Sequence, residues 1–280
     1  ESLKECLARV SEKKKEKNNL IAPVSFAGAV APLAQCQKLA SENNFILVED
    51  ASHSPGASSP DEQEGTISSC SGTHALASTL SFHPVKHICA GEGGAVLTND
   101  LHVAQKALRL RSHGINRPFT EIDEMPWYYE QESLGWNYRL TDLQATLGLS
   151  QLNRLDDFLA KRRKLARRYD QRLSESPFQE HINCPPFEEG HAWHLYIIRF
   201  KEVSLRNLAY KYLKSKNILT QVHYIPVYKH PYYQKQNQGF KLPGAEKFFQ
   251  GCLSIPMYPD LKENEQDRVL ETLEQFLLKG

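Results

Sequence analysis

The chain has 280 residues, and its 34 Lys and Arg nearly balance 33 Asp and Glu, which leaves a formal net charge of +1. A charge this close to zero gives no global field that would draw the protein to nucleic acid or to an anionic membrane surface. Hydrophobic residues make up 40% of the chain, which suffices for a core and argues against a disordered protein. No apolar run approaches the ~18 residues of a bilayer-spanning helix. We therefore expect neither a nucleic-acid nor a membrane partner.

The cysteines and histidines form no recognisable metal or redox motif. The six cysteines are dispersed without a Cys-x-x-Cys pair, and in a chain of this length reduced thiols in the cytosol fit better than disulfides. Among the 11 histidines, His191 and His194 are close together in a predicted strand, but no His-Glu-x-x-His sequence occurs. The sequence thus predicts a cytoplasmic location and no metal site.

The first half of the chain alternates between short apolar runs and helical patterns. Strands are predicted at 20–24, 45–50, 75–82 and 94–98, and helices at 32–43 and 100–111. The Ser-, Gly- and Pro-rich residues 54–73 and the segment 83–93 indicate loops. Strands that are apolar on both faces and alternate with helices are typical of a parallel sheet covered by helices.

The second half begins with a long helical pattern. The aromatic-rich stretch 114–136 indicates a long functional loop, and leucines then recur at helical spacing over 141–174, a span long enough to join two lobes. A smaller α+β domain is predicted by strands at 194–200 and 219–224 and helices at 204–216 and 263–278. We expect a large domain over residues 1–175, including the connecting helix, and a small domain over residues 176–280.

Chemistry-bearing side chains follow two of the predicted strands. Asp50 ends one strand, and in open α/β sheets ligands bind beyond the carboxyl ends of strands; taken alone, it fits a capping or turn aspartate at least as well. Lys86 follows a strand that ends near Ser81, and taken alone it fits a solvated loop cation. The glycines at 91–94 match neither a Walker loop nor a dinucleotide fingerprint. Together, the two strand ends supply a carboxylate, an amine and a hydroxyl, as a pyridoxal phosphate site requires.

Ordered segments along nearly the whole chain carry a more specific pattern. These segments are 45–53, 81–86, 91–96, 111–115, 135–145 and 222–227. They resemble the DegT-type sugar-nucleotide aminotransferases, which are fold-type I pyridoxal phosphate enzymes. The resemblance implies an α/β fold with a mostly parallel sheet in a pyridoxal phosphate-binding large domain, together with a small α+β C-terminal domain.

The resemblance also implies a role for each matching position. Lys86 would form the Schiff base with the cofactor, Asp50 would pair with the pyridinium nitrogen, and His53 would lie near the ring hydroxyl. Ser81 would hold the phosphate, and Asn137 would reach the phosphate in a neighbouring subunit, which implies a homodimer. A lysine rather than a histidine at position 86 favours transamination over the dehydrating branch of the family.

The implied substrate is a sugar nucleotide, whose site would be lined by Val222, His223, Tyr224 and Ile225. The segments 126–130, 223–226 and 230–233 resemble the branch of the family that serves pseudaminic acid biosynthesis. The implied reaction transfers an amino group from glutamate to a UDP-linked 4-keto-6-deoxy sugar in nonulosonic acid or surface-glycan biosynthesis. Two alternatives remain: a family member that acts on another GDP- or dTDP-linked 4-keto sugar, and a truncated, non-catalytic fragment of the fold.

The beginning of the chain departs from the family pattern. The chain opens at Glu1 without an initiator methionine, and nothing in it corresponds to the N-terminal Gly-Thr turn with which family members grip the cofactor phosphate. We expect the N-terminal part of the large domain to be absent from this chain. Such a fragment is expected to bind pyridoxal phosphate weakly or not at all.

Overall fold

The computed structural model describes residues 2–8, 19–61, 65–116, 125, 127–235 and 239–279. The chain divides into two units, Glu1–Asp156 and Asp157–Gly280. This division falls near the beginning of helix α6 (Leu155–Leu173), whereas the boundary predicted after residue 175 follows the end of that helix. The units divide there because the buried side chains of α6 belong to the core of the second unit. The functional domains 1–175 and 176–280 stay a prediction.

The first unit is built on a four-stranded sheet. Its strands lie in the order β1 (Asn19–Ile21), β2 (Phe45–Asp50), β5 (Ala77–Ser81) and β6 (Gly94–Leu97). The first three are parallel, and β6 pairs with β5 in the antiparallel direction. The predicted α/β fold with a mostly parallel sheet is thereby confirmed.

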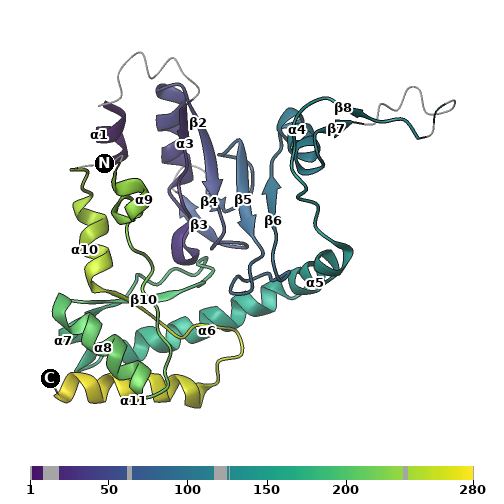
Figure 1. Cartoon of the computed structure of the whole chain (residues 1–280). Helices are drawn as coiled ribbons and strands as arrows, with labels where there is room; N and C mark the ends of the chain where they lie inside the picture. The colour runs from purple at the N-terminus through teal and green to yellow at the C-terminus, as the bar shows by residue number, and fades with distance from the viewer. Residues whose placement is uncertain are drawn as a thin grey trace. The chain divides into compact units, whose positions relative to one another are not determined.

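Helix α3 (Leu33–Glu42) packs against β2 (Figure 1). It buries Leu33, Cys36 and Ala40 on one face, as its apolar spacing predicts. Cys36 and Ala40 join a core cluster with Leu47 of β2 and with Leu7 of the short helix α1 (Ser2–Ala8). This cluster covers one face of the sheet and does not include the residues at the carboxyl ends of β2 and β5.

The prediction of a loop over residues 54–73 is wrong in part, because this segment contains a β-hairpin. Strand β3 (Ser58–Asp61) pairs antiparallel with β4 (Gly65–Ser68). Backbone hydrogen bonds hold the two strands, and Ile67 is buried. A polar hairpin of this kind has no apolar alternation, so the sequence pattern did not reveal it.

The helix predicted over 141–174 consists of two helices, α5 (Asp142–Leu152) and α6. Helix α5 begins with a capping box, in which the side-chain oxygens of Thr141 and Gln144 each accept a backbone N–H of the other residue. It ends at Asn153, whose N–H donates to the carbonyl oxygen of Leu149 over 3.0 Å. Leucines continue on both sides of this interruption, which is why the apolar pattern alone predicted one helix.

Three further elements lie in the chain between β6 and α5. Helix α4 (Leu101–Arg111) is capped by Asp100, whose carboxylate accepts the N–H of Val103. It agrees with the helix predicted at 100–111. The predicted loop 114–136 contains the strands β7 (Ile115–Asn116) and β8 (Glu130–Gln131), which pair antiparallel. Residues 117–124 and Pro126 of that stretch lie outside the described residues.

The second unit contains a three-stranded antiparallel sheet. Its strands lie in the order β11 (Cys252–Ile255), β10 (Tyr196–Phe200) and β9 (Ile182–Asn183). Its other elements are α7 (Phe178–His181), α8 (Val203–Ser215), the 3₁₀ turn η3 (Val227–Lys229), α9 (Pro231–Gln234), α10 (Pro243–Gly251) and α11 (Glu263–Lys279). This mixture confirms the predicted α+β character. The strand predicted at 219–224 is wrong, since that segment makes only one bridge to the sheet, between Gln221 and Ser254.

The core of the second unit is tied to α6 by a buried guanidinium. Arg162 is 4% exposed, and its Nη1 donates to the carbonyl oxygens of Trp193, His194 and Met257 over 2.9, 3.2 and 3.1 Å. Burial lowers the pKa of Arg162 to about 10. The three carbonyl groups are therefore satisfied by one cation that holds two loops against the helix. Among the described residues, no helix is long and apolar enough to span a bilayer.

Replacing Arg162 by methionine should destabilise the protein markedly. The substitution keeps an unbranched apolar stem but removes the guanidinium and leaves three buried carbonyl groups without this donor, so we expect a loss of about 3 kcal/mol in the free energy of unfolding. Urea denaturation followed by circular dichroism measures it. Lys164→Met on the same helix is the control, because Lys164 pairs with Glu263 at an exposed position and contributes little. Equal urea midpoints for the two variants would contradict this role of Arg162.

Candidate active site

Asp50 is the last residue of β2, at the carboxyl edge of the sheet. Its backbone is held on both sides: its N–H donates to the carbonyl oxygen of Pro23, and its own carbonyl oxygen accepts the N–H of Ser25, each over 2.9 Å. One side-chain oxygen, Oδ1, accepts the N–H of Ser52 over 3.0 Å. The carboxylate is thus fixed in place where ligands of open α/β sheets bind.

Lys86 lies in the turn that follows β5, the strand next to β2. Its N–H donates to the carbonyl oxygen of His83 over 2.9 Å. Burial lowers the pKa of the Lys86 amine, and the negative charge of Asp50 partly opposes this by raising it. The structure therefore brings the amine and the carboxylate into one electrostatic environment.

His53 and Ser81 lie on the segments that carry these two residues. His53 is 6% exposed, and its Nδ1 accepts the N–H of Ala27 over 3.3 Å. Its ring lies against Phe26, with the ring centroids 5.7 Å apart. Ser81 ends β5, two residues beyond the Thr79 that pairs with Asp50 in the sheet. Four of the predicted site residues thus follow two neighbouring strands.

Asn137 occupies a different part of the first unit. It forms an antiparallel bridge with Ser112, at the end of α4, and its side chain is exposed. The neighbouring N–H of Tyr138 donates to the carbonyl oxygen of Arg111 over 2.9 Å. The segment is therefore fixed along the end of α4, with Asn137 on the surface of the unit.

The four predicted substrate-binding residues belong to the second unit. Val222 packs against the core, while Tyr224 and Ile225 are half exposed. The imidazole Nδ1 of His223 lies 2.7 Å from the hydroxyl of Ser254 on β11. This contact anchors the segment and leaves Tyr224, whose ring stands edge-on to that of His223, at the surface.

The residue that sequence reasoning missed is Glu49, which is 1% exposed. Its carboxylate accepts hydrogen bonds from the hydroxyl groups of Ser25, Ser69 and Ser78 over 2.7, 2.6 and 2.8 Å. It also accepts a hydrogen bond from the N–H of Cys70 over 3.0 Å. These partners come from the segment after β1, the end of β4 and β5. A glutamate within an otherwise apolar strand was the one signal that could have indicated a buried polar network.

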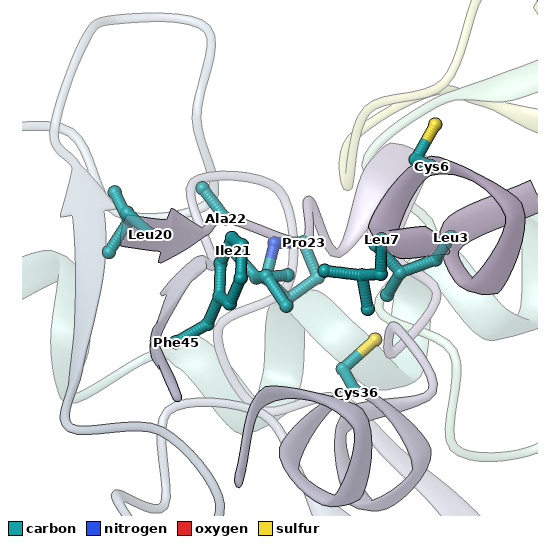
Figure 2. Close-up of a pocket in the computed structure, with 9 residues that line it drawn as sticks. All are labelled: Leu3, Cys6, Leu7, Leu20, Ile21, Ala22, Pro23, Cys36 and Phe45. Atoms are coloured by element: carbon teal, nitrogen blue, oxygen red, sulfur yellow. The ribbon is translucent and has the colours of Figure 1, made fainter. Parts of the chain in front are cut away.

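An apolar hollow of about 410 Å³ lies elsewhere in the first unit (Figure 2). Figure 2 shows it between α1, β1 and α3, and its lining residues are Leu3, Cys6, Leu7, Leu20, Ile21, Ala22, Pro23, Cys36 and Phe45. None of the predicted catalytic or cofactor-binding residues is among them. Because the chemistry-bearing side chains are at the carboxyl edge of the sheet, we assign the candidate site to that edge and not to the hollow.

The match to known proteins extends through both units. The model of the DegT/DnrJ/EryC1/StrS aminotransferase family matches residues 1–274. The spore coat polysaccharide biosynthesis protein SpsC of Bacillus subtilis (strain 168) is 34% identical over 272 residues, which are 93% of this chain and 67% of that protein.

Two solved structures share the fold. Helicobacter pylori PseC, an aminotransferase involved in the biosynthesis of pseudoaminic acid, superposes with a TM-score of 0.85 at 28% identity, over 98% of this chain and 69% of that one. The PMP-form of Spr1654, a putative sugar aminotransferase from Streptococcus pneumoniae, gives a TM-score of 0.82 at 25% identity, over 94% of this chain and 70% of that one.

Replacing Asp50 by asparagine should lower the pKa of Lys86 further. The substitution removes the negative charge that raises this pKa and leaves the burial that lowers it. The pKa is read as the pH midpoint for labelling of Lys86 by an amine-selective reagent, quantified by peptide mass spectrometry. Glu92→Gln, at an exposed acid in the loop after Lys86, is the control and should leave the midpoint unchanged. A midpoint that does not move in Asp50→Asn would show that the two side chains are not coupled.

Proposed function

This chain belongs to the DegT/DnrJ/EryC1/StrS aminotransferase family, and we propose that it acts in the cytoplasm as a pyridoxal phosphate-dependent aminotransferase of a sugar nucleotide. The observation that carries the proposal is the placement of Asp50 at the end of β2 and of Lys86 in the turn after β5, the neighbouring parallel strand. The PMP-form of the related Spr1654 structure supports the choice of cofactor.

The residues at the carboxyl edge fit this cofactor. Its aldehyde carbon needs an amine, and the lowered pKa of Lys86 increases the fraction of neutral amine that can attach it. Its pyridine nitrogen needs a fixed carboxylate, which Asp50 supplies, and His53 and Ser81 are assigned to the ring hydroxyl and the phosphate. When bound, the cofactor supplies an electron sink for the carbon that carries the amino group. The Nζ of Lys86 would move the proton between this carbon and the carbon of the cofactor to which the amino group is transferred.

For the substrate, we propose a UDP-linked 4-keto-6-deoxy sugar, with glutamate as the amino donor. The product would be UDP-4-amino-4,6-dideoxy-N-acetyl-β-L-altrosamine, a precursor in pseudaminic acid biosynthesis. The similarity to PseC supports this pathway, and the similarity to SpsC supports a role in surface-glycan biosynthesis. The exposed faces of Tyr224 and Ile225 are available to the sugar nucleotide.

Lys86→Ala should abolish amino transfer. We expect turnover to fall by about 10³-fold or more, because both the attachment of the cofactor and the proton transfer depend on this amine. Product formation from glutamate and the UDP-linked 4-keto sugar is followed by mass spectrometry, and cofactor binding by absorbance. Lys106→Ala, at an exposed lysine of α4, is the control and should retain full activity.

Two outcomes would contradict parts of this proposal. Retained turnover in Lys86→Ala would overturn the mechanism. Faster amination of a GDP- or dTDP-linked 4-keto sugar would overturn the choice of nucleotide and leave the aminotransferase reaction in place.

A homodimer is proposed from the surface of helix α5. Helix α5 carries several leucines, a residue type that is usually buried, yet it contains no buried residue. Leu143 is 86% exposed, and Leu147, Leu149 and Leu152 are exposed on the same helix. Asn137, assigned to the cofactor of a neighbouring subunit, lies a few residues before the beginning of this helix. We propose that a second copy of the chain covers this helix.

Charges on α5 should disrupt this dimer. The double variant Leu143→Glu, Leu147→Glu places two carboxylates in the proposed apolar contact, so we expect a monomer where the wild-type chain is a dimer. Sedimentation velocity at micromolar concentration measures the change. Leu208→Glu, at an exposed leucine of α8, is the control and should remain dimeric. A monomeric wild-type chain would contradict the proposed interface.

A further inference from the structure

The hydroxyl of Ser25 connects the buried carboxylate of Glu49 to the turn that follows β1. It donates to Oε1 of Glu49 over 2.7 Å and accepts the N–H of Ala31 over 3.1 Å. The N–H of Ser25 also donates to the carbonyl oxygen of Asp50. Ser25 is fully buried, so these three bonds fix both its backbone and its side chain. One end of the segment 25–31 is thereby attached to β2.

The same segment delivers a hydrogen-bond donor to His53. It contains the 3₁₀ turn η1 (Phe26–Gly28), in which Ala27 has a φ of 59°. This left-handed conformation is unfavourable for alanine, so the turn needs support from its surroundings. Ala31 closes the turn through its bond to the Ser25 hydroxyl. In this conformation the N–H of Ala27 points at Nδ1 of His53, 3.3 Å away.

The direction of that bond determines where the imidazole carries its hydrogen. A backbone N–H can only donate, so Nδ1 of His53 must accept, and a neutral ring then carries its hydrogen on Nε2. We propose that Ser25, anchored by Glu49, is a positioning residue that holds His53 in this Nε2–H tautomer. Without the hydroxyl, the turn loses its closure and Nδ1 loses its fixed donor.

The consequence for the site rests on the proposed function. With Nδ1 occupied by the turn, Nε2–H is the nitrogen that donates to the ring oxygen of the bound cofactor. The opposite tautomer would present an acceptor to that oxygen and repel its negative charge. Ser25 and Glu49 touch neither cofactor nor substrate in this scheme, since they act through the turn and His53.

The test uses the full chain before any cofactor is added. The ¹⁵N chemical shifts of the two imidazole nitrogens of His53 report its tautomer, and amide hydrogen exchange reports the protection of Ala27. We expect the Nε2–H tautomer and a protected Ala27 amide in the wild-type chain. In Ser25→Ala we expect a mixture of tautomers and Ala27 exchange that is faster by about 10-fold or more.

Ser78→Ala is the matched control. It removes another hydroxyl from the same Glu49 carboxylate but leaves the closure of the turn intact, so both His53 and Ala27 should behave as in the wild type. Equal effects in the two variants would mean that only the stability of the Glu49 network matters, and would overturn the proposal.

Measurements on the wild-type chain also test the proposal. A wild-type chain with a rapidly exchanging Ala27 amide, or with the hydrogen of His53 on Nδ1, would overturn it without any variant, which covers the case in which Ser25→Ala does not fold. Titration with pyridoxal phosphate afterwards is a separate experiment. Binding would support the proposed function, and weak or absent binding, which the sequence predicts for this chain, would leave the tautomer result standing.

Discussion

The buried carboxylate of Glu49 is the interaction on which the edge of the first unit depends. Burying a carboxyl group costs free energy unless its oxygens are hydrogen-bonded, and here four donors from three other segments converge on it. Each hydrogen bond restricts the conformation of its donor. Glu49 therefore fixes the segment after β1, the end of β4 and the strand β5 relative to β2. The side chains that carry the chemistry follow these same segments.

Glu49 and Asp50 are neighbours on β2, and their side chains lie on opposite faces of the sheet. Side chains alternate along a strand, so the fully buried Glu49 points to one face and the half-buried Asp50 to the other. Asp50 then interacts with Lys86 across the open edge. The net pKa of Lys86 is lowered, which means that burial outweighs the attraction to Asp50. That balance suits the nucleophilic role proposed for this amine.

Local sequence patterns predicted an element correctly where its structure depends on the spacing of its own apolar residues. The apolar spacing of α3 and the apolar run of β2 are such cases. The polar hairpin β3–β4 and the interruption at Asn153 were missed, because neither changes the apolar pattern. The Glu49 network was out of reach for a different reason: its side-chain partners lie 20 to 29 residues away in the chain, so no local spacing encodes it.

Asp50 and Lys86 each also had a purely structural interpretation from the sequence, as a turn aspartate and as a solvated loop cation. Taken alone, Asp50 fits a capping or turn aspartate at least as well as a site residue, and its Oδ1 accepts the N–H of Ser52 two residues on. A carboxylate has two oxygens and about four acceptor positions, so the turn uses only part of its capacity and also fixes its orientation. Lys86 was also explained as a solvated loop cation; its side chain is half-buried, and burial lowers the pKa of the amine while the charge of Asp50 raises it. A residue's structural role and its chemical role are therefore compatible at Asp50, and the first prepares the second.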